Sequence, residues 1–158
     1  MSDTPTLTEQ EWQRTAAIDS FNLTWRLLEK PDRTSDETDR MIHAAHTSRF
    51  HWQAAGDVTN WLRGDWQLAH VYTLLEQPQI ALHFARLCLE HCEANHIGDF
   101  DLAYAHEGLA RALACNNEID EAEQHYRLAA AAGRTIAEDE DRELFVTDLA
   151  AGPWFGLK

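Results

Sequence analysis

The chain has 158 residues, the usual size of a single domain and enough to bury a hydrophobic core. Its 13 Lys and Arg residues against 27 Asp and Glu residues leave a formal net charge of −14. Such a charge repels nucleic-acid phosphates and anionic lipid head groups, so we expect neither nucleic acid nor a membrane as a partner. A basic segment of another protein would be attracted.

The N-terminus and the cysteines indicate a cytoplasmic protein. Met1 to Pro5 do not begin a signal peptide, because no basic stretch there leads into an apolar one. No run of about 18 apolar residues could span a membrane. The cysteines are an odd number in a chain that needs no disulfides, so we expect reduced thiols at Cys88, Cys92 and Cys115.

Apolar residues recur at spacings of three and four along the whole chain, which predicts amphipathic helices and no strands. Seven helices are expected, at residues 9–29, 35–55, 58–75, 78–95, 99–115, 119–132 and 137–149. Thr8 with Glu11, and Thr34 with Glu37, have the spacing of capping boxes. The connections are short, so consecutive helices should be antiparallel neighbours.

Other residues mark where the helices begin and end. Asp57 can cap the third helix, and Pro78 suits the first turn of the fourth. Pro31 disfavours helix at the residue before it. Gly56 and Gly133 are natural C-terminal stops, so the sixth helix is expected to end at Gly133.

An internal repeat is the main signal. Four positions recur at an offset of 41 residues, namely Leu68, Ala69, Tyr72 and Ala81 as Leu109, Ala110, Leu113 and Ala122. Through these residues the chain resembles the tetratricopeptide repeat family, whose pattern is W-x2-L-G-x2-Y followed by A-x3-F. The second unit fits best, because Tyr126 and Ala129 also match. The resemblance implies stacked antiparallel helical hairpins, in which small residues let two helices approach closely.

The repeat departs from the family in its length and in some residues. The family period is about 34 residues, and the difference from 41 amounts to about two helical turns. The first unit has Ala85 and Cys88 where the family has an aromatic residue and an alanine. A generic helical bundle whose Leu and Ala positions coincide by chance is the alternative.

We expect residues 1–158 to form one all-α domain of the tetratricopeptide-like α-solenoid kind. Its expected parts are a hairpin at 9–56, two repeat units at 62–134, a capping helix at 137–150 and an apolar tail at 151–158. A step of 41 residues back from Trp66 reaches Trp25, so the first hairpin can be read as a degenerate repeat.

The resemblance also implies a groove, lined by the first helix of each unit, that binds a segment of a partner protein. The expected groove residues are Arg63, Trp66, His70, Tyr104, Glu107 and Arg111. This aromatic and charged set suits a partner, although some of the six could instead be core residues or ion pairs between helices. The Lys and Asn set with which some family members hold a C-terminal carboxylate is absent.

Histidines and cysteines raise a metal hypothesis. His43, His46 and His51 lie on one predicted helix, and a second group has i, i+3 and i+4 spacing, namely Cys88, His91 and Cys92. Neither is a recognised ligand pattern, and there is no nucleophile elbow, phosphate-binding loop or dinucleotide fingerprint. We therefore predict a protein-binding module with no catalytic residue, metal or cofactor. A metal-dependent enzyme that uses the His-rich second helix is the alternative.

The tail contains Trp154 between two glycines and a proline, and is not expected to be helical. It can fold back on the last helix, dock on a neighbouring molecule or stay mobile. Docking on a neighbour would make the chain a homodimer or a self-assembling structural protein.

Overall fold

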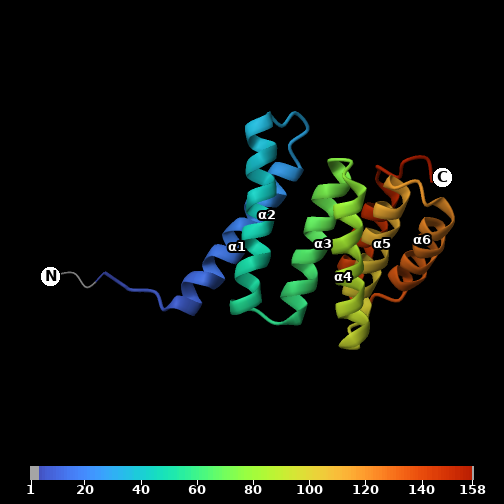
Figure 1. Cartoon of the computed structure of the whole chain (residues 1–158). Coiled ribbons are helices and arrows are strands. Elements are labelled where there is room, and N and C mark those ends of the chain that lie inside the picture. Colours follow the sequence, from blue (N-terminus) through green and yellow to red (C-terminus); the bar gives the residue numbers. More distant parts are fainter. Residues whose placement is uncertain (1–3, 158) are drawn as a thin grey trace. The chain divides into compact units, whose positions relative to one another are not determined.

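The computed structural model describes residues 4–157, and within them the chain is all-helical, as predicted. Met1 to Asp3, where no signal peptide is expected, and Lys158 of the tail lie outside the described residues. The seven helices of the described chain are α1 (Glu9–Leu28), α2 (Ser35–Ala55), α3 (Val58–Leu74), α4 (Pro78–Ala94), α5 (Asp99–Cys115), α6 (Ile119–Arg134) and α7 (Asp139–Ala150) (Figure 1). None of them is both long enough and apolar enough to cross a membrane.

The predicted capping residues begin the helices as expected. Both capping boxes are formed: Thr8 Oγ1 accepts from the Glu11 amide at 3.2 Å, and Thr34 Oγ1 accepts from the Glu37 amide at 3.2 Å. Asp57 Oδ1 accepts from the backbone amide of Thr59 at 3.0 Å, ahead of α3. Local side-chain contacts therefore set where α1, α2 and α3 begin.

The chain divides into two compact units, Met1–Gly64 and Asp65–Lys158, where the sequence predicts one domain. The boundary falls inside α3. In the first unit, α1 and α2 form an antiparallel hairpin (Figure 1). Met41 is fully buried in it, and the Ser48 hydroxyl of α2 donates to the Ala17 carbonyl of α1 at 2.8 Å.

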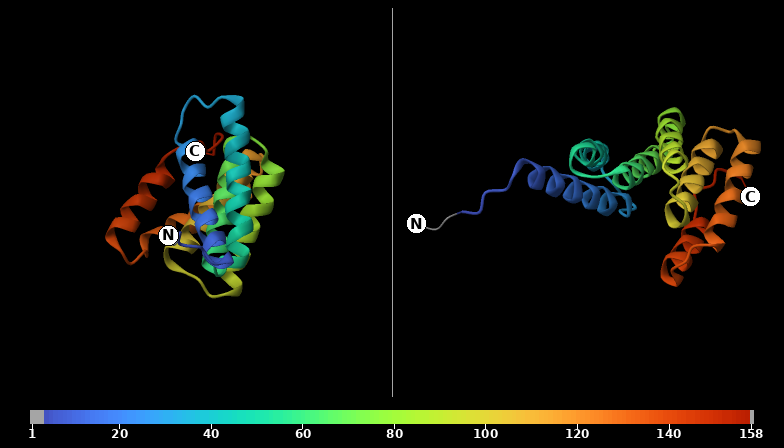
Figure 2. Two further views of the ribbon diagram at one scale, coloured as in Figure 1. Left: turned by 90° about the vertical axis from the view of Figure 1, so that its left-hand side faces the viewer. Right: turned by 90° about the horizontal axis from the view of Figure 1, so that it is seen from below.

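The second unit contains both copies of the four positions that recur at the 41-residue offset, and α5 and α6 form a hairpin in it. α4 packs against α5, and α7 packs against both α5 and α6 (Figures 1 and 2). The small repeat residues are fully buried, at 0% exposure for Ala81, Ala110, Ala122 and Ala129. These small residues allow the helices of this unit to approach closely.

The sixth helix does not end at Gly133, so that prediction is wrong. α6 continues to Arg134, and Gly133 is buried inside it. A Cβ atom at Gly133 would lie 2.3 Å from Cε1 of Phe145, a fully buried residue of α7. The glycine therefore makes room for the Phe145 ring and does not stop the helix.

The substitution Gly133→Ala should lower the free energy of unfolding of the second unit by about 1–3 kcal/mol, the usual cost of overpacking a core. The gain in helix propensity, about 1 kcal/mol, is too small to reverse this loss. Urea unfolding followed by circular dichroism measures the change. The matched control is Gly98→Ala, because a Cβ atom there meets nothing within 4 Å. Equal stabilities of the two variants would contradict the packing role of Gly133.

Candidate functional site

The structure brings five of the six expected groove residues together in the second unit. Trp66 and His70 lie one turn apart on α3, and their rings stack with centroids 5.2 Å apart and planes at 10°. Tyr104, Glu107 and Arg111 lie on α5, at spacings that put them on one helix face. The sixth, Arg63, is exposed and belongs to the first unit.

Trp66 connects α3 to α5. Its indole Nε1 donates to Glu107 Oε2 at 3.0 Å, and its ring meets the Tyr104 ring edge to face at 5.5 Å. Gly108 makes this approach possible, because a Cβ atom there would lie 2.9 Å from Trp66 Cδ1. Trp66 and Glu107 are 41 residues apart, so equivalent positions of the two repeat units touch each other.

Glu107 and Arg111 form an ion pair that is almost fully removed from water. Their exposed fractions are 1% and 3%, and Arg111 Nε donates to Glu107 Oε1. Burial raises the pKa of Glu107 above its usual value, and the nearby guanidinium and the Trp66 indole only partly offset this. A buried carboxylate is stable only while such partners remain.

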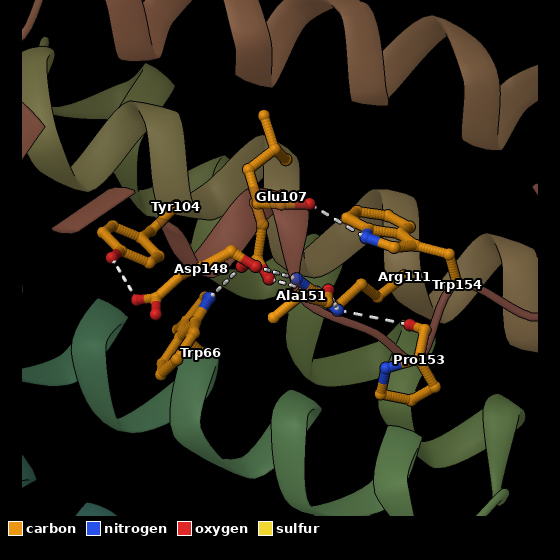
Figure 3. A network of polar contacts seen from close by, with 9 residues as sticks. Trp66, Tyr104, Glu107, Arg111, Asp148, Ala151, Pro153 and Trp154 are labelled. Carbon is orange, nitrogen blue, oxygen red and sulfur yellow. Dashed lines mark hydrogen bonds and ion pairs between the residues drawn. The ribbon is translucent and has the colours of Figure 1, made fainter. Parts of the chain in front are cut away.

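The other donors of Arg111 face the chain's own C-terminal segment, defined here as residues 139–157 (Figure 3). Its Nη2 donates to the Asp148 carbonyl at 2.7 Å, and its Nη1 donates to the carbonyls of Ala151 at 2.9 Å and Pro153 at 3.2 Å. Arg111 therefore binds one carbonyl in the last turn of α7, that of Asp148, which also accepts from the Ala151 amide at 3.1 Å, and two carbonyls just beyond the helix.

The aromatic side chains around Arg111 complete the attachment of the C-terminal segment. The guanidinium of Arg111 lies 4.1 Å from the centroid of the Trp154 ring. Trp154 is 7% exposed, donates from Nε1 to the Leu149 carbonyl at 3.0 Å and meets Tyr126 edge to face at 4.9 Å. Of the three fates open to the tail, the structure has it folded back on its own unit.

Tyr104 makes the remaining polar contact to the C-terminal segment. Its hydroxyl donates to Asp148 Oδ2 at 2.6 Å, as Figure 3 shows. Burial, with the carboxylate of Asp148, raises the pKa of Tyr104 well above its usual value, so the phenol keeps its proton. Asp148 was not among the predicted site residues, because nothing in the sequence shows that an acidic residue of α7 faces α5.

The expectation for Tyr104, Glu107 and Arg111 needs a correction. They were listed as groove residues, with core residues or ion pairs as the alternative; the structure has all three buried and in contact with α3, α7 or the tail. The physical reason is that α7 and its tail offer helix-end carbonyls and an aromatic ring on the same unit, where they are always close to α5. A partner can reach these three residues only where the C-terminal segment leaves them.

His70 is held neutral in this site. Burial and the positive charge of Arg111 lower the pKa of His70 from 6.5 to about 4. The unfolded chain therefore takes up a proton at His70 between these two pH values, whereas the folded chain does not. The contribution of the neutral His70 to the free energy of unfolding is therefore complete above pH 6.5 and is lost as the pH falls towards 4.

The substitution His70→Asn should accordingly flatten the pH dependence of stability. Wild-type protein should lose up to about 2 kcal/mol between pH 7 and pH 5 through this residue, since each pH unit is worth about 1.4 kcal/mol. Urea unfolding of both proteins at the two pH values measures the difference. The other histidines are present in both proteins and cancel in the comparison. An unchanged pH dependence in the variant would contradict a neutral His70.

The histidine and cysteine groups that raised the metal hypothesis do not form a cluster of metal ligands within the described residues. Among residues 4–157, no group of three or more His, Cys, Asp or Glu side chains is placed to hold a metal ion. All three cysteines are free, and Cys88 and Cys92 are buried. His91 Nε2 lies 3.5 Å from Asp65 Oδ2 on α3.

Comparison of the chain with protein-family models, with curated proteins and with solved structures finds no match.

Proposed function

We propose that this chain is a protein–protein interaction module, built from tetratricopeptide-like hairpins, that binds a segment of another protein on the face lined by α3 and α5. One observation carries the proposal: this face already holds a peptide segment, the C-terminal segment. Arg111 donates to three backbone carbonyls of that segment and lies against an aromatic ring. A partner segment with a helix end and an aromatic side chain could make the same contacts after displacing it.

This proposal makes the chain a binding protein and not an enzyme. The net charge of −14 favours a partner segment of basic character, and disfavours nucleic acid and anionic membranes. The three free cysteines agree with a cytoplasmic location, where thiols stay reduced. The sequence contributes no catalytic motif that would support a reaction instead.

The test compares full-length baits that differ at single residues. Proteins captured from a lysate are quantified by mass spectrometry for wild type, Trp154→Ala, Trp66→Ala and the control Leu128→Ala, an exposed residue of α6. Trp154→Ala weakens the attachment of the C-terminal segment, which competes with the partner for the same face. Capture of the partner should therefore rise about threefold or more. Trp66→Ala removes the indole of the face and should reduce capture. Circular dichroism confirms that each bait is folded.

A competition arm shows whether the captured protein uses this face. A synthetic peptide of residues 139–157 should displace the partner from the Trp154→Ala bait, because the two bind the same residues. A peptide with alanine in place of both Phe145 and Trp154 should displace it less. Capture that responds neither to the variants nor to the peptide would overturn the proposal.

A further inference from the structure

A pair of histidines lies between α5 and α6, apart from the contacts of the C-terminal segment. His106 on α5 and His125 on α6 are half-buried, and their Nδ1 atoms are 3.0 Å apart. The ring centroids are 5.2 Å apart, with the planes at 27°. The two nitrogens therefore face each other across the hairpin, and two packed helices hold them there.

Both rings are neutral near pH 7. Burial lowers the pKa of His106 to about 4, and burial also lowers the pKa of His125. Two neutral imidazoles at this distance share one hydrogen bond, in which one Nδ1 donates and the other accepts. A neutral imidazole is also the form in which histidine binds metals.

The charges around His125 favour a cation. Glu121 lies one turn earlier on α6, Glu93 comes from α4, and both act on His125 as negative charges. Arg86 of α4 is the opposing charge that acts on it. Two carboxylates against one guanidinium, in a chain of net charge −14, leave the neighbourhood negative.

We propose that His106 and His125 are the two protein ligands of a site for a divalent late first-row transition-metal ion, with Cu²⁺ bound most tightly. Imidazole nitrogen suits Cu²⁺, Ni²⁺ and Zn²⁺, and affinity in this series is highest for Cu²⁺. With metal–nitrogen bonds of about 2.0–2.1 Å, two neighbouring ligands lie about 2.9 Å apart in a square plane and about 3.3 Å apart in a tetrahedron. The observed 3.0 Å lies between these two values.

Binding needs only small rearrangements. The ring that donates the hydrogen bond moves its proton from Nδ1 to Nε2, and both rings turn so that their Nδ1 lone pairs meet at the ion. Each imidazole stays neutral, so no net proton is released. Water fills the remaining coordination positions. Because the ligands come from two helices of one hairpin, the ion connects α5 to α6 and stabilises the folded unit.

Calorimetric titration of the full-length, tag-free chain with CuCl₂ and with ZnCl₂ tests the site. We expect one tight Cu²⁺ equivalent per chain and weaker binding of Zn²⁺. His106→Asn and His125→Asn should each weaken Cu²⁺ binding about tenfold or more and abolish the rise in Tm that Cu²⁺ causes. The matched control replaces both His43 and His46, which lie three residues apart on α2, by asparagine and should bind as wild type.

Nuclear magnetic resonance of the wild-type chain gives a measurement that needs no variant. Zn²⁺ should shift the Nδ1 resonances of His106 and His125 and leave those of His43 and His46 in place. The proposal is overturned if the His106 and His125 variants bind Cu²⁺ like wild type, if only the control variant loses binding, or if Zn²⁺ leaves both Nδ1 resonances unchanged.

Discussion

Replacing Arg111 by methionine is expected to lower the free energy of unfolding of the second unit by about 3–5 kcal/mol, the cost of leaving a buried charge without its partner. Glu107 is 1% exposed, so its carboxylate cannot turn to water when the guanidinium is removed. The Trp66 indole would remain as its donor at 3.0 Å. Urea unfolding followed by circular dichroism measures the loss.

The double substitution Glu107→Gln with Arg111→Met shows how much of the lost stability comes from the unpaired charge of Glu107 and how much from the lost carbonyl contacts of Arg111. It removes the buried charge, so it should restore at least half of the stability that Arg111→Met loses. What it cannot restore are the hydrogen bonds to the carbonyls of Asp148, Ala151 and Pro153. A double variant as unstable as the single one would contradict this. The loss of stability in Arg111→Met would then come from the missing carbonyl contacts and not from the unpaired carboxylate of Glu107.

The helices could be predicted from the sequence because their signals are local. Capping boxes at Thr8 and Thr34 lie within four residues of the atoms they bind. Gly133 was misread for the opposite reason, since its role depends on Phe145, 12 residues further on and on another helix. A glycine that ends a helix and a glycine that makes room for a ring have the same sequence pattern.

The site was predictable in part. The 41-residue offset placed Trp66 and Glu107 at equivalent positions, and the structure joins them by a hydrogen bond. Helical spacing put Glu107 and Arg111 on one face of α5. It could not show that α7 and the tail cover this face, because the apolar pattern of the tail does not say which surface the tail packs on. The contact between His106 and His125 joins two helices, so the residue spacing within either helix could not predict it.

The C-terminal segment should depend on one aromatic anchor more than on its exposed apolar residues. Phe145 of α7 is fully buried, with Gly133 on one side and the Tyr104 ring edge to face at 4.9 Å. Phe145→Ala is expected to cost about 3–5 kcal/mol, because the cavity cannot be closed by neighbours that are themselves packed. Leu144→Ala, at a neighbouring position that is 50% exposed, is the matched control and should cost less than about 0.5 kcal/mol.

Phe145→Ala also tests how the C-terminal segment is attached to α5 and α6. Hydrogen exchange should show α7 losing its protection first, and the carbonyls that Arg111 binds should become exposed with it. Limited proteolysis should then cut within residues 139–157 in this variant and spare them in Leu144→Ala. If both variants resist the protease equally, Arg111 and Trp154 hold the segment without help from Phe145, and a partner would have to displace those two contacts before α7 moves.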